Sequence, residues 1–191
     1  MLRRGYEVVG VDLSESMVQQ CSQQTPPLPA AVMDAQQLGL TPNSLDLVVS
    51  LYDSLNYIVD PAGLQSCWEG VNYALQPGGL FVFDLNTERA LRTDLFSQSN
   101  TASSDPLQYR WKSYWDANKK LCRIEMWFQW RGGPQPIEFT ETHYERAYDE
   151  DEVRQMLAAA GFDEVAMYNA YTMQPPTHRS NRVYYVAEKP A

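Results

Sequence analysis

The stretch Glu7–Ser16, "EVVGVDLSES", decides the fold of this chain. Its first six residues are mostly Val and Gly, without alternation of polar and apolar side chains, which is typical of a parallel strand buried on both faces. Asp12 ends this strand, and Ser14 is a favourable cap for a helix that we expect to run to about Gln24. A strand that ends on an acidic residue before a helix is the pattern of the second strand in nucleotide-binding α/β folds.

Further strands and helices alternate along the next 70 residues or so. Apolar runs at Ala30–Met33, Leu45–Leu51 and Leu80–Leu85 predict strands, and Asp60-Pro61 begins a segment with apolar residues at helical spacing. This order predicts an α/β fold of the Rossmann-like type, in which a doubly wound, mostly parallel sheet carries helices on both faces.

The pattern changes after Thr87. A short helix is expected from Glu88 to Phe96, and three strand-like runs follow with hairpin-like linkers: Gln108–Trp115, Leu121–Trp130 and Ile137–Arg146. The middle run alternates apolar and polar residues, which favours an antiparallel sheet with one buried face. We therefore expect an antiparallel β insertion over 97–146, between a first core part over 1–96 and a final core part over 147–191.

The final core part predicts one helix and two strands. Val153, Met156, Leu157 and Ala160 form an apolar helix face, and Gly161 suits the position after the helix end. The runs Glu164–Tyr171 and Val183–Glu188 predict strands that are antiparallel to each other.

Composition excludes several classes of function. The 191 residues carry a net charge of −9 without a cluster of Lys and Arg, which argues against binding to nucleic acid. No apolar run approaches the ~20 residues of a membrane span. The three cysteines have no spacing typical of a metal site, so we expect no metal and a cytoplasmic protein with reduced thiols.

Two acidic residues carry the first chemical signal. Asp12 ends one predicted strand and Asp34 follows the next, so both belong at the carboxyl edge of a parallel sheet. A carboxylate there can accept hydrogen bonds from a ribose diol, and its neighbour can accept one from the amine of adenine. The alternative for each is an ordinary helix-capping or solvated loop Asp.

A loop rich in hydrogen-bonding side chains carries the second signal. The segment Ser50–Ile58, "SLYDSLNYI", follows the most apolar strand, at the edge where such folds bind ligands. This loop and five other segments, taken in their order along the chain, resemble the class I S-adenosylmethionine-dependent methyltransferases, in the small-molecule branch with a β-sheet insertion. The segments before the loop are "VVGVDLSESMV" and "AVMDAQQL", and those after it are "ALQPGGLFVFDLNT", "MLAAAGF" and "RVYYVAEK". The resemblance covers nearly the whole chain from Gly5.

The resemblance implies S-adenosylmethionine as the cofactor, a small-molecule methyl acceptor, and an insertion that covers the acceptor pocket. Asp12 resembles the ribose-binding acid, and Asp34 with the amide of Ala35 resembles the residues that meet adenine. The remaining residues implied to contact the cofactor are Leu13 and Met17 near the adenine, and Leu51 and Tyr52 along the methionine arm.

One departure from the family concerns its first strand. No G-x-G-x-x-G segment occurs anywhere, and the strand, Gly-rich loop and helix that precede the equivalent of Glu7 in the family have no counterpart here. That loop holds the charged end of the cofactor, and that strand lies in mid-sheet. We expect an N-terminally shortened form that binds the cofactor poorly, with two strand edges left open or paired in a homodimer.

The sequence says less about the residues that contact the methyl acceptor than about those that contact the cofactor. Asn56, Tyr57 and His143 are the candidates for contact with the acceptor, and no residue is named as a general base. The aromatic residues of the insertion fit either a wall over an amine acceptor, or packing and a dimer interface. Two alternatives to the enzyme stay open: a non-catalytic remnant that acts by protein association, and a nicotinamide-dependent enzyme that shares the acid at Asp12.

Overall fold

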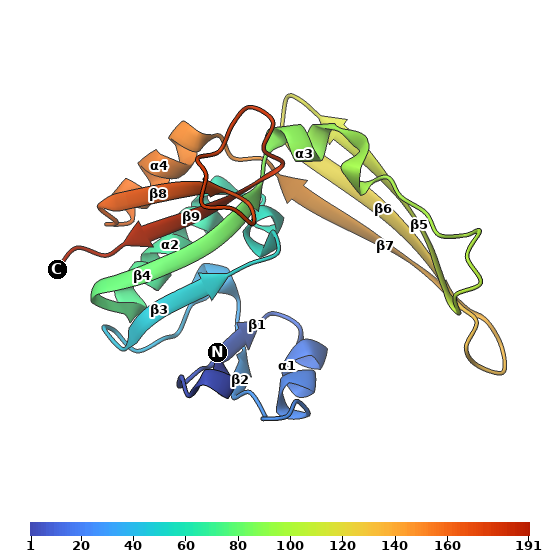
Figure 1. Cartoon of the computed structure of the whole chain (residues 1–191), viewed down its shortest axis with the longest axis horizontal. Coiled ribbons are helices and arrows are strands. Elements are labelled where there is room, and N and C mark those ends of the chain that lie inside the picture. Colours follow the sequence, from blue (N-terminus) through green and yellow to red (C-terminus); the bar gives the residue numbers. More distant parts are fainter.

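The computed structural model describes the backbone of residues 1–191 and all side chains except those at positions 94 and 164. Within this description the strands form a two-stranded sheet, a four-stranded sheet and a three-stranded sheet. The three-stranded sheet extends away from the rest of the molecule (Figure 1). Over the described part of the chain, no helix has the length and apolar character that a membrane crossing requires.

The predicted elements are present, but the first strand is shorter than expected, the strand expected to start at Leu80 begins five residues earlier, and the helix expected over Glu88–Phe96 ends at Arg92. The strands are β1 (Gly10–Asp12), β2 (Ala30–Val32), β3 (Leu45–Ser50), β4 (Leu75–Asn86), β5 (Leu107–Asp116), β6 (Leu121–Trp130), β7 (Ile137–Arg146), β8 (Glu164–Asn169) and β9 (Arg182–Glu188). The α-helices are α1 (Glu15–Ser22), α2 (Pro61–Ala74), α3 (Glu88–Arg92) and α4 (Glu150–Ala159). The 3₁₀ turns are η1 (Leu2–Arg4), η2 (Ala35–Gln37), η3 (Ser54–Tyr57) and η4 (Asp94–Phe96).

The four-stranded sheet has the order β3-β4-β9-β8 and contains the main core. β3 pairs with β4 in parallel, whereas β9 is antiparallel to both β4 and β8, which confirms the predicted antiparallel final pair. Helices α2 and α4 cover one face of this sheet (Figure 1). On that face Trp68 packs on Phe83 at 5.4 Å between ring centroids, and Leu64 and Leu157 are fully buried.

The other face of the four-stranded sheet differs from the expectation of helices on both faces. Leu47, Val49 and Leu80 lie on adjacent strands and remain partly exposed on this face. Among the described residues no helix packs over them, so this face is open. The fold class is confirmed, but the sheet is divided, and parallel pairing is limited to β1–β2 and β3–β4 within the described chain.

The division lies between β1 and β3. β1 pairs only with β2, and β3 pairs only with β4, in the chain that the structure describes. The expected strand Glu7–Asp12 is therefore shortened to three residues, and it is not buried on both faces: Val9 is 51% and Val11 is 39% exposed. Apolar side chains of the expected kind are present, but no neighbouring strand covers the edge of β1 that faces β3.

The two-stranded unit is joined to the core through packing of η2 and Leu38 on α2. Gly63 and Gly70 face this segment: a Cβ on Gly63 would collide with the Gln36 side chain, and one on Gly70 would lie 3.2 Å from the Leu38 Cβ. Ala35 and Leu38 add to the main core from this side. The absence of side chains at these two helix positions thus lets the chain after β2 approach α2.

The insertion forms the three-stranded sheet in the order β5-β6-β7. Two of its three strands have the predicted bounds, and β5 is longer by one residue at each end. One face of this sheet forms a second core with α3, which includes Leu91, Cys122, Ile124 and Met126. The division of the chain into two core parts and an insertion over 97–146 stays a prediction.

Substitution of Leu64 tests the main core. Leu64→Ala removes a fully buried side chain between α2 and the sheet, so the free energy of unfolding is expected to fall by about 2–5 kcal/mol in urea denaturation. Leu13→Ala is the matched control, because Leu13 is 72% exposed and its truncation is expected to change stability by less than about 0.5 kcal/mol. Equal losses in the two variants would contradict the assignment of the core.

Candidate functional site

The carboxyl ends of β1 and β2 bring Asp12 and Asp34 to the same edge. The two strands are parallel and in register, with Asp12 opposite Val32, and Asp34 follows two residues after Val32. Asp12 Oδ1 accepts from the amide of Ser14 at 2.8 Å, and Asp34 Oδ1 accepts from the amide of Gln36 at 2.9 Å. Among the hydrogen bonds of the described residues, the Oδ2 atom of each acid has no protein partner.

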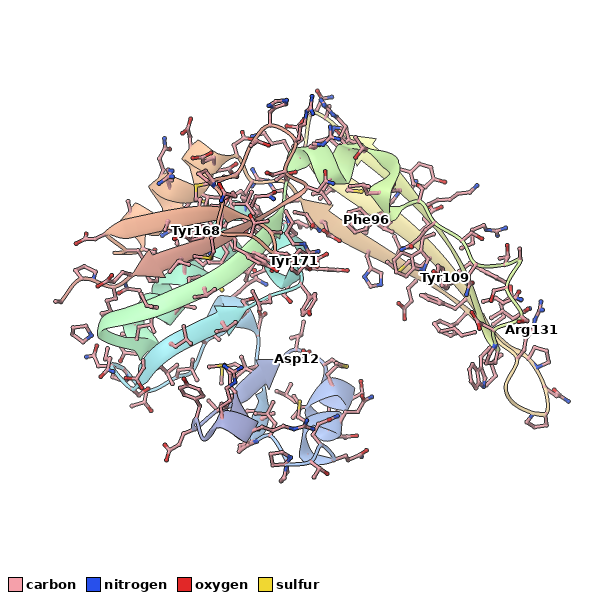
Figure 2. All side chains as sticks on the ribbon, in the orientation of Figure 1. Asp12, Phe96, Tyr109, Arg131, Tyr168 and Tyr171 are labelled. Atoms are coloured by element: carbon pink, nitrogen blue, oxygen red, sulfur yellow. The ribbon has the colours of Figure 1, made fainter. Side chains whose placement is uncertain are left out.

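Both acids thus accept a local backbone hydrogen bond, Asp34 as the cap of η2 and Asp12 in the turn before α1, and each remains a ligand candidate. Figure 2 places Asp12 at the end of the two-stranded unit that faces the rest of the molecule. Leu13 and Met17 follow on the loop and first turn of α1 and are largely exposed, while Ala35 is partly buried against the main core. A nucleoside at this edge would have two carboxylate oxygens and exposed apolar side chains available to it.

The loop after β3 has an unusual backbone. Tyr52 and Asp53 are consecutive non-glycine residues in the left-handed region, with φ of 63° and 56°. Such conformations are costly for residues with a Cβ and persist where surrounding contacts determine them. Leu51 and Tyr52 are exposed here, with Tyr52 at 74%.

Arg182 on β9 holds this loop in place. Its guanidinium donates to Asp53 Oδ1 at 2.9 Å and to Asp84 Oδ2 at 2.6 Å. The amide of Asp53 donates to Asp84 Oδ1 at 3.2 Å. Burial raises the pKa of the Asp84 carboxyl, and the adjacent Arg182 charge opposes that shift.

Asn86 links the same loop to the insertion. Its Nδ2 donates to Asp53 Oδ2 at 2.9 Å and to Glu145 Oε2, on β7, also at 2.9 Å. Glu145 is 1% exposed. Burial raises the pKa of the Glu145 carboxyl to about 7, a shift that the Asn86 hydrogen bond opposes and the Asp53 charge reinforces.

Asn56, an expected acceptor contact, has a structural position instead. It is fully buried, its Nδ2 donates to the carbonyls of Asn86 and Arg146, and its Oδ1 accepts from the amide of Asn86. These bonds join η3 to β4 and β7 and leave the side chain no access to an acceptor. We therefore do not retain Asn56 as a contact residue.

Tyr57 and His143, the other two candidates, lie in contact. The Tyr57 hydroxyl is 3.0 Å from His143 Nδ1, and His143 Nε2 is 3.1 Å from Glu141 Oε2. Burial, followed by the nearby charges of Glu145, Asp53 and Glu141, raises the pKa of Tyr57 to about 12. The phenol therefore keeps its proton at neutral pH. The direction of its bond to His143 depends on the imidazole tautomer: with the Nε2 proton directed at the Glu141 carboxylate, Nδ1 of the neutral ring accepts and the phenol donates.

The aromatic residues of the insertion divide between the two faces of its sheet. Strand alternation puts Tyr109, Trp111 and Phe128 on the face that also carries His143 and Glu145. Trp111, Trp115 and Phe128 pack against the second core, which supports the packing interpretation for these residues. Arg110 stacks over Trp127, and Arg123 over Tyr114, on the opposite face.

Sequence reasoning misses most of the Arg182 network. Asp84, Asn86, Glu145 and Arg182 are not among the candidates from the sequence, although "FDLN" has polar residues at the carboxyl end of an apolar strand, which is the available signal for the first two. Within the described residues, no group of three or more His, Cys, Asp or Glu side chains is arranged to hold a metal ion.

The buried Glu145 predicts a pH dependence of stability. Its pKa in the folded chain lies above the ordinary value of 4.5, so the folded state binds this proton more tightly than the unfolded state. The resulting stabilisation is fully present below that ordinary value and is lost as pH rises through the folded pKa. The whole change is about 3 kcal/mol, because each tenfold change in proton affinity corresponds to about 1.4 kcal/mol.

Urea unfolding of wild type and Glu145→Gln at a series of pH values measures this change. The glutamine resembles the protonated carboxyl, so the variant is expected to match wild type in acid and to become more stable than wild type above neutral pH. Glu69→Gln, at an exposed position on α2, is the control and is expected to follow wild type throughout. A constant difference between wild type and Glu145→Gln at all pH values would contradict the assignment.

Comparison with known proteins shows that the chain is similar to methyltransferases. Residues 1–83 match the family model described as "Methyltransferase domain". The Bacillus subtilis protein named "Putative methyltransferase YqeM" is 28% identical over 194 residues, which cover 99% of this chain and 78% of that protein.

Solved structures agree on the fold. A S-adenosylmethionine-dependent methyltransferase from Clostridium acetobutylicum superposes with a TM-score of 0.86 at 24% identity, covering 97% of this chain and 76% of that one. The sugar N-methyltransferase KedS8 from Streptoalloteichus gives 0.80 at 19% identity, covering 96% and 71%. The chain therefore has the fold of the class I S-adenosylmethionine-dependent methyltransferases, and its first 83 residues match a methyltransferase domain.

Proposed function

We propose that the chain transfers a methyl group from S-adenosylmethionine to a small-molecule acceptor bound between the core and the insertion. The observation that carries this proposal is the pair Asp12 and Asp34, which end adjacent parallel strands with an unbonded carboxylate oxygen each among the described residues. Asp12 would accept from the ribose hydroxyls and Asp34 from the adenine amine. Leu13 and Met17 would pack against the adenine, beside the Ala35 amide.

The residues present fit the adenosine part of the cofactor better than its amino-acid end. The described chain has no strand between β1 and β3 and no Gly-rich loop at this edge. The exposed loop residues Leu51 and Tyr52 are the groups proposed to lie along the methionine arm. When bound, the cofactor supplies an electrophilic methyl group on a sulfonium, and the protein supplies alignment and exclusion of water.

Alignment depends on a fixed loop after β3. Arg182, Asp84 and Asn86 hold Asp53, and thereby hold the left-handed backbone at Tyr52. A loop held at several points keeps the groups that contact the reactants in one geometry, which is the main contribution of the protein to a displacement reaction. We assign Asp53, Asn86 and Arg182 the role of positioning residues.

Tyr57, His143 and Glu141 are proposed to remove a proton from the acceptor. The Tyr57 oxygen would take the acceptor proton while its own proton passes to His143 Nδ1, and Glu141 would stabilise the imidazolium through Nε2. A base that is oriented by a carboxylate and bonded to a hydroxyl is a recurrent arrangement for activating nucleophiles. An acceptor that arrives protonated, such as an ammonium, needs this step.

Titration with adenosine and with S-adenosylhomocysteine tests the cofactor site. Asp12→Asn and Asp34→Asn keep the local backbone hydrogen bonds but remove a charged acceptor, so each is expected to weaken adenosine binding by about tenfold or more. Asp46→Asn is the control, since Asp46 lies near the start of β3 at the opposite edge of the sheet and is expected to bind as wild type. Unchanged binding in both site variants would overturn the proposal.

The same titrations test whether the chain binds the amino-acid end of the cofactor. Because the residues of this chain hold mainly the adenosine part, adenosine and S-adenosylhomocysteine are expected to bind within about threefold of each other, both weakly. Isothermal titration calorimetry that gives low-micromolar binding of S-adenosylhomocysteine, with far weaker adenosine, would contradict this expectation.

Nitrogen NMR of the two histidines tests the proton path. In wild type at alkaline pH, His143 is expected to carry its proton on Nε2, because the Tyr57 phenol donates to Nδ1. Tyr57→Phe removes this donor and is expected to shift the His143 nitrogen signals toward a mixture of tautomers, while His178 serves as an internal control. A proton on His143 Nδ1 in wild type would contradict the proposed direction of transfer.

A further inference from the structure

A cavity of about 440 Å³ lies between the core and the insertion, next to the loop that Arg182 holds. Asn86 and Arg182 form its wall on the sheet side, Leu95 and Phe96 form its wall on the insertion side, and the segment between β8 and β9 closes it. Its volume is in the range of sites that bind small molecules. Tyr57 and His143 are not among its lining residues, so the cavity would hold a part of the acceptor other than the one that Tyr57 deprotonates.

The polar side chains from the β8–β9 segment are not used within the protein. Asn169, at the end of β8, is partly buried, whereas Arg179 and Asn181 are exposed at the cavity's edge. None of the three side chains has a hydrogen-bond or ion-pair partner among the described residues. Arg182 differs, because its guanidinium is already bound by Asp53 and Asp84. One guanidinium and two amides are thus free to bind a ligand.

The backbone that carries Arg179 is fixed. The amide of Ser180 donates to the carbonyl of Thr177 at 2.9 Å, the Ser180 hydroxyl accepts from the Thr177 amide at 2.9 Å, and Thr87 Oγ1 donates to the carbonyl of Ser180 at 2.9 Å. Ser180 is itself buried. A guanidinium on such a turn loses less freedom on binding than one on a mobile loop.

Backbone strain at Tyr171 is a second sign of a ligand site. Tyr171 lines the cavity, has φ of 62°, and lies edge-to-face with Tyr184 at 5.7 Å between ring centroids. A bulky residue in the left-handed region is uncommon, and such residues concentrate at functional sites. Figure 2 shows Tyr171 and Phe96 on the two sides of the junction between core and insertion.

We propose that this cavity binds the methyl acceptor through an anionic group, a carboxylate or a phosphate ester, held by Arg179. The planar guanidinium fork matches both groups in bidentate geometry. Asn169 and Asn181 would bind hydroxyl or carbonyl groups of the acceptor, and Leu95 and Phe96 would contact its apolar face. The acceptor is thus a small, hydroxyl-bearing anion, an inference that rests on the proposed methyl transfer and adds the substrate class.

Titration of the full chain with three sugars tests the inference: glucose 6-phosphate, glucuronate and neutral glucose. At least one anionic sugar is expected to bind in the millimolar range or tighter and to shift the NMR signals of residues 169–182, with glucose at least about tenfold weaker. The tighter of the two anions identifies phosphate or carboxylate as the group. Absence of saturable binding by both anions would overturn the inference.

Variants of Arg179 locate the site. Arg179→Gln is expected to weaken binding of the anionic sugar by about tenfold or more, and Arg179→Lys to give an intermediate loss, because the charge remains and the fork is lost. Arg131→Gln is the control, an exposed arginine at the far end of the insertion (Figure 2), and is expected to bind as wild type. Unchanged binding in Arg179→Gln, in a variant whose circular dichroism matches wild type, would overturn the inference.

The outcome is independent of the cofactor titrations. If adenosine binding does not change in Asp12→Asn and Asp34→Asn, the proposed methyl transfer is contradicted. The anion titrations would still show whether the cavity binds an anion. If Asp12→Asn and Asp34→Asn weaken adenosine binding but Arg179→Gln leaves anion binding unchanged, only the proposal of an anionic acceptor is contradicted.

Discussion

The buried ion pair between Arg182 and Asp84 is the interaction on which the candidate site depends. The Asp84 side chain has no exposed surface, and a carboxylate there without its cation would cost several kcal/mol. The same guanidinium binds Asp53, so Arg182 both pairs with the buried Asp84 carboxylate and fixes the position of the loop after β3. The last strand of the chain therefore determines the geometry of a loop that lies 129 residues earlier in the sequence.

The insertion is coupled to this interaction through amide side chains. Asn86 joins Asp53 to Glu145, and Asn56 joins η3 to the carbonyls of both β4 and β7. The loop after β3, the Tyr57–His143 pair and the cavity beside Arg179 consequently share the same hydrogen-bonded support. Movement of the insertion relative to the core would have to break bonds at Asn56 or Glu145, both of which are buried.

Periodicity and turn residues are sufficient to predict the elements of this fold. The insertion strands at Leu121–Trp130 and Ile137–Arg146 agree with the prediction to the residue, because alternation of side chains is a local property of the sequence. The predicted burial of the first strand is wrong, because Val9 and Val11 are apolar whether or not a neighbouring strand covers them. The carboxyl-edge positions of Asp12 and Asp34 follow from strand ends alone. The partners of Arg182 and Glu145 are fixed by pairings across 98 residues and 59 residues, for which the local sequence holds no signal.

Two glycines in α2 have a consequence for the spacing between two parts of the fold. Gly63 and Gly70 have no side chain beyond the backbone, yet their bare helix surface sets how near the segment after Asp34 comes to the main core. No backbone pairing connects β1 to β3 in the described chain, so packing on this helix surface contributes to the distance between Asp34 and Tyr52. The distance between two candidate site segments can thus depend on residues that belong to neither segment and that act by leaving space.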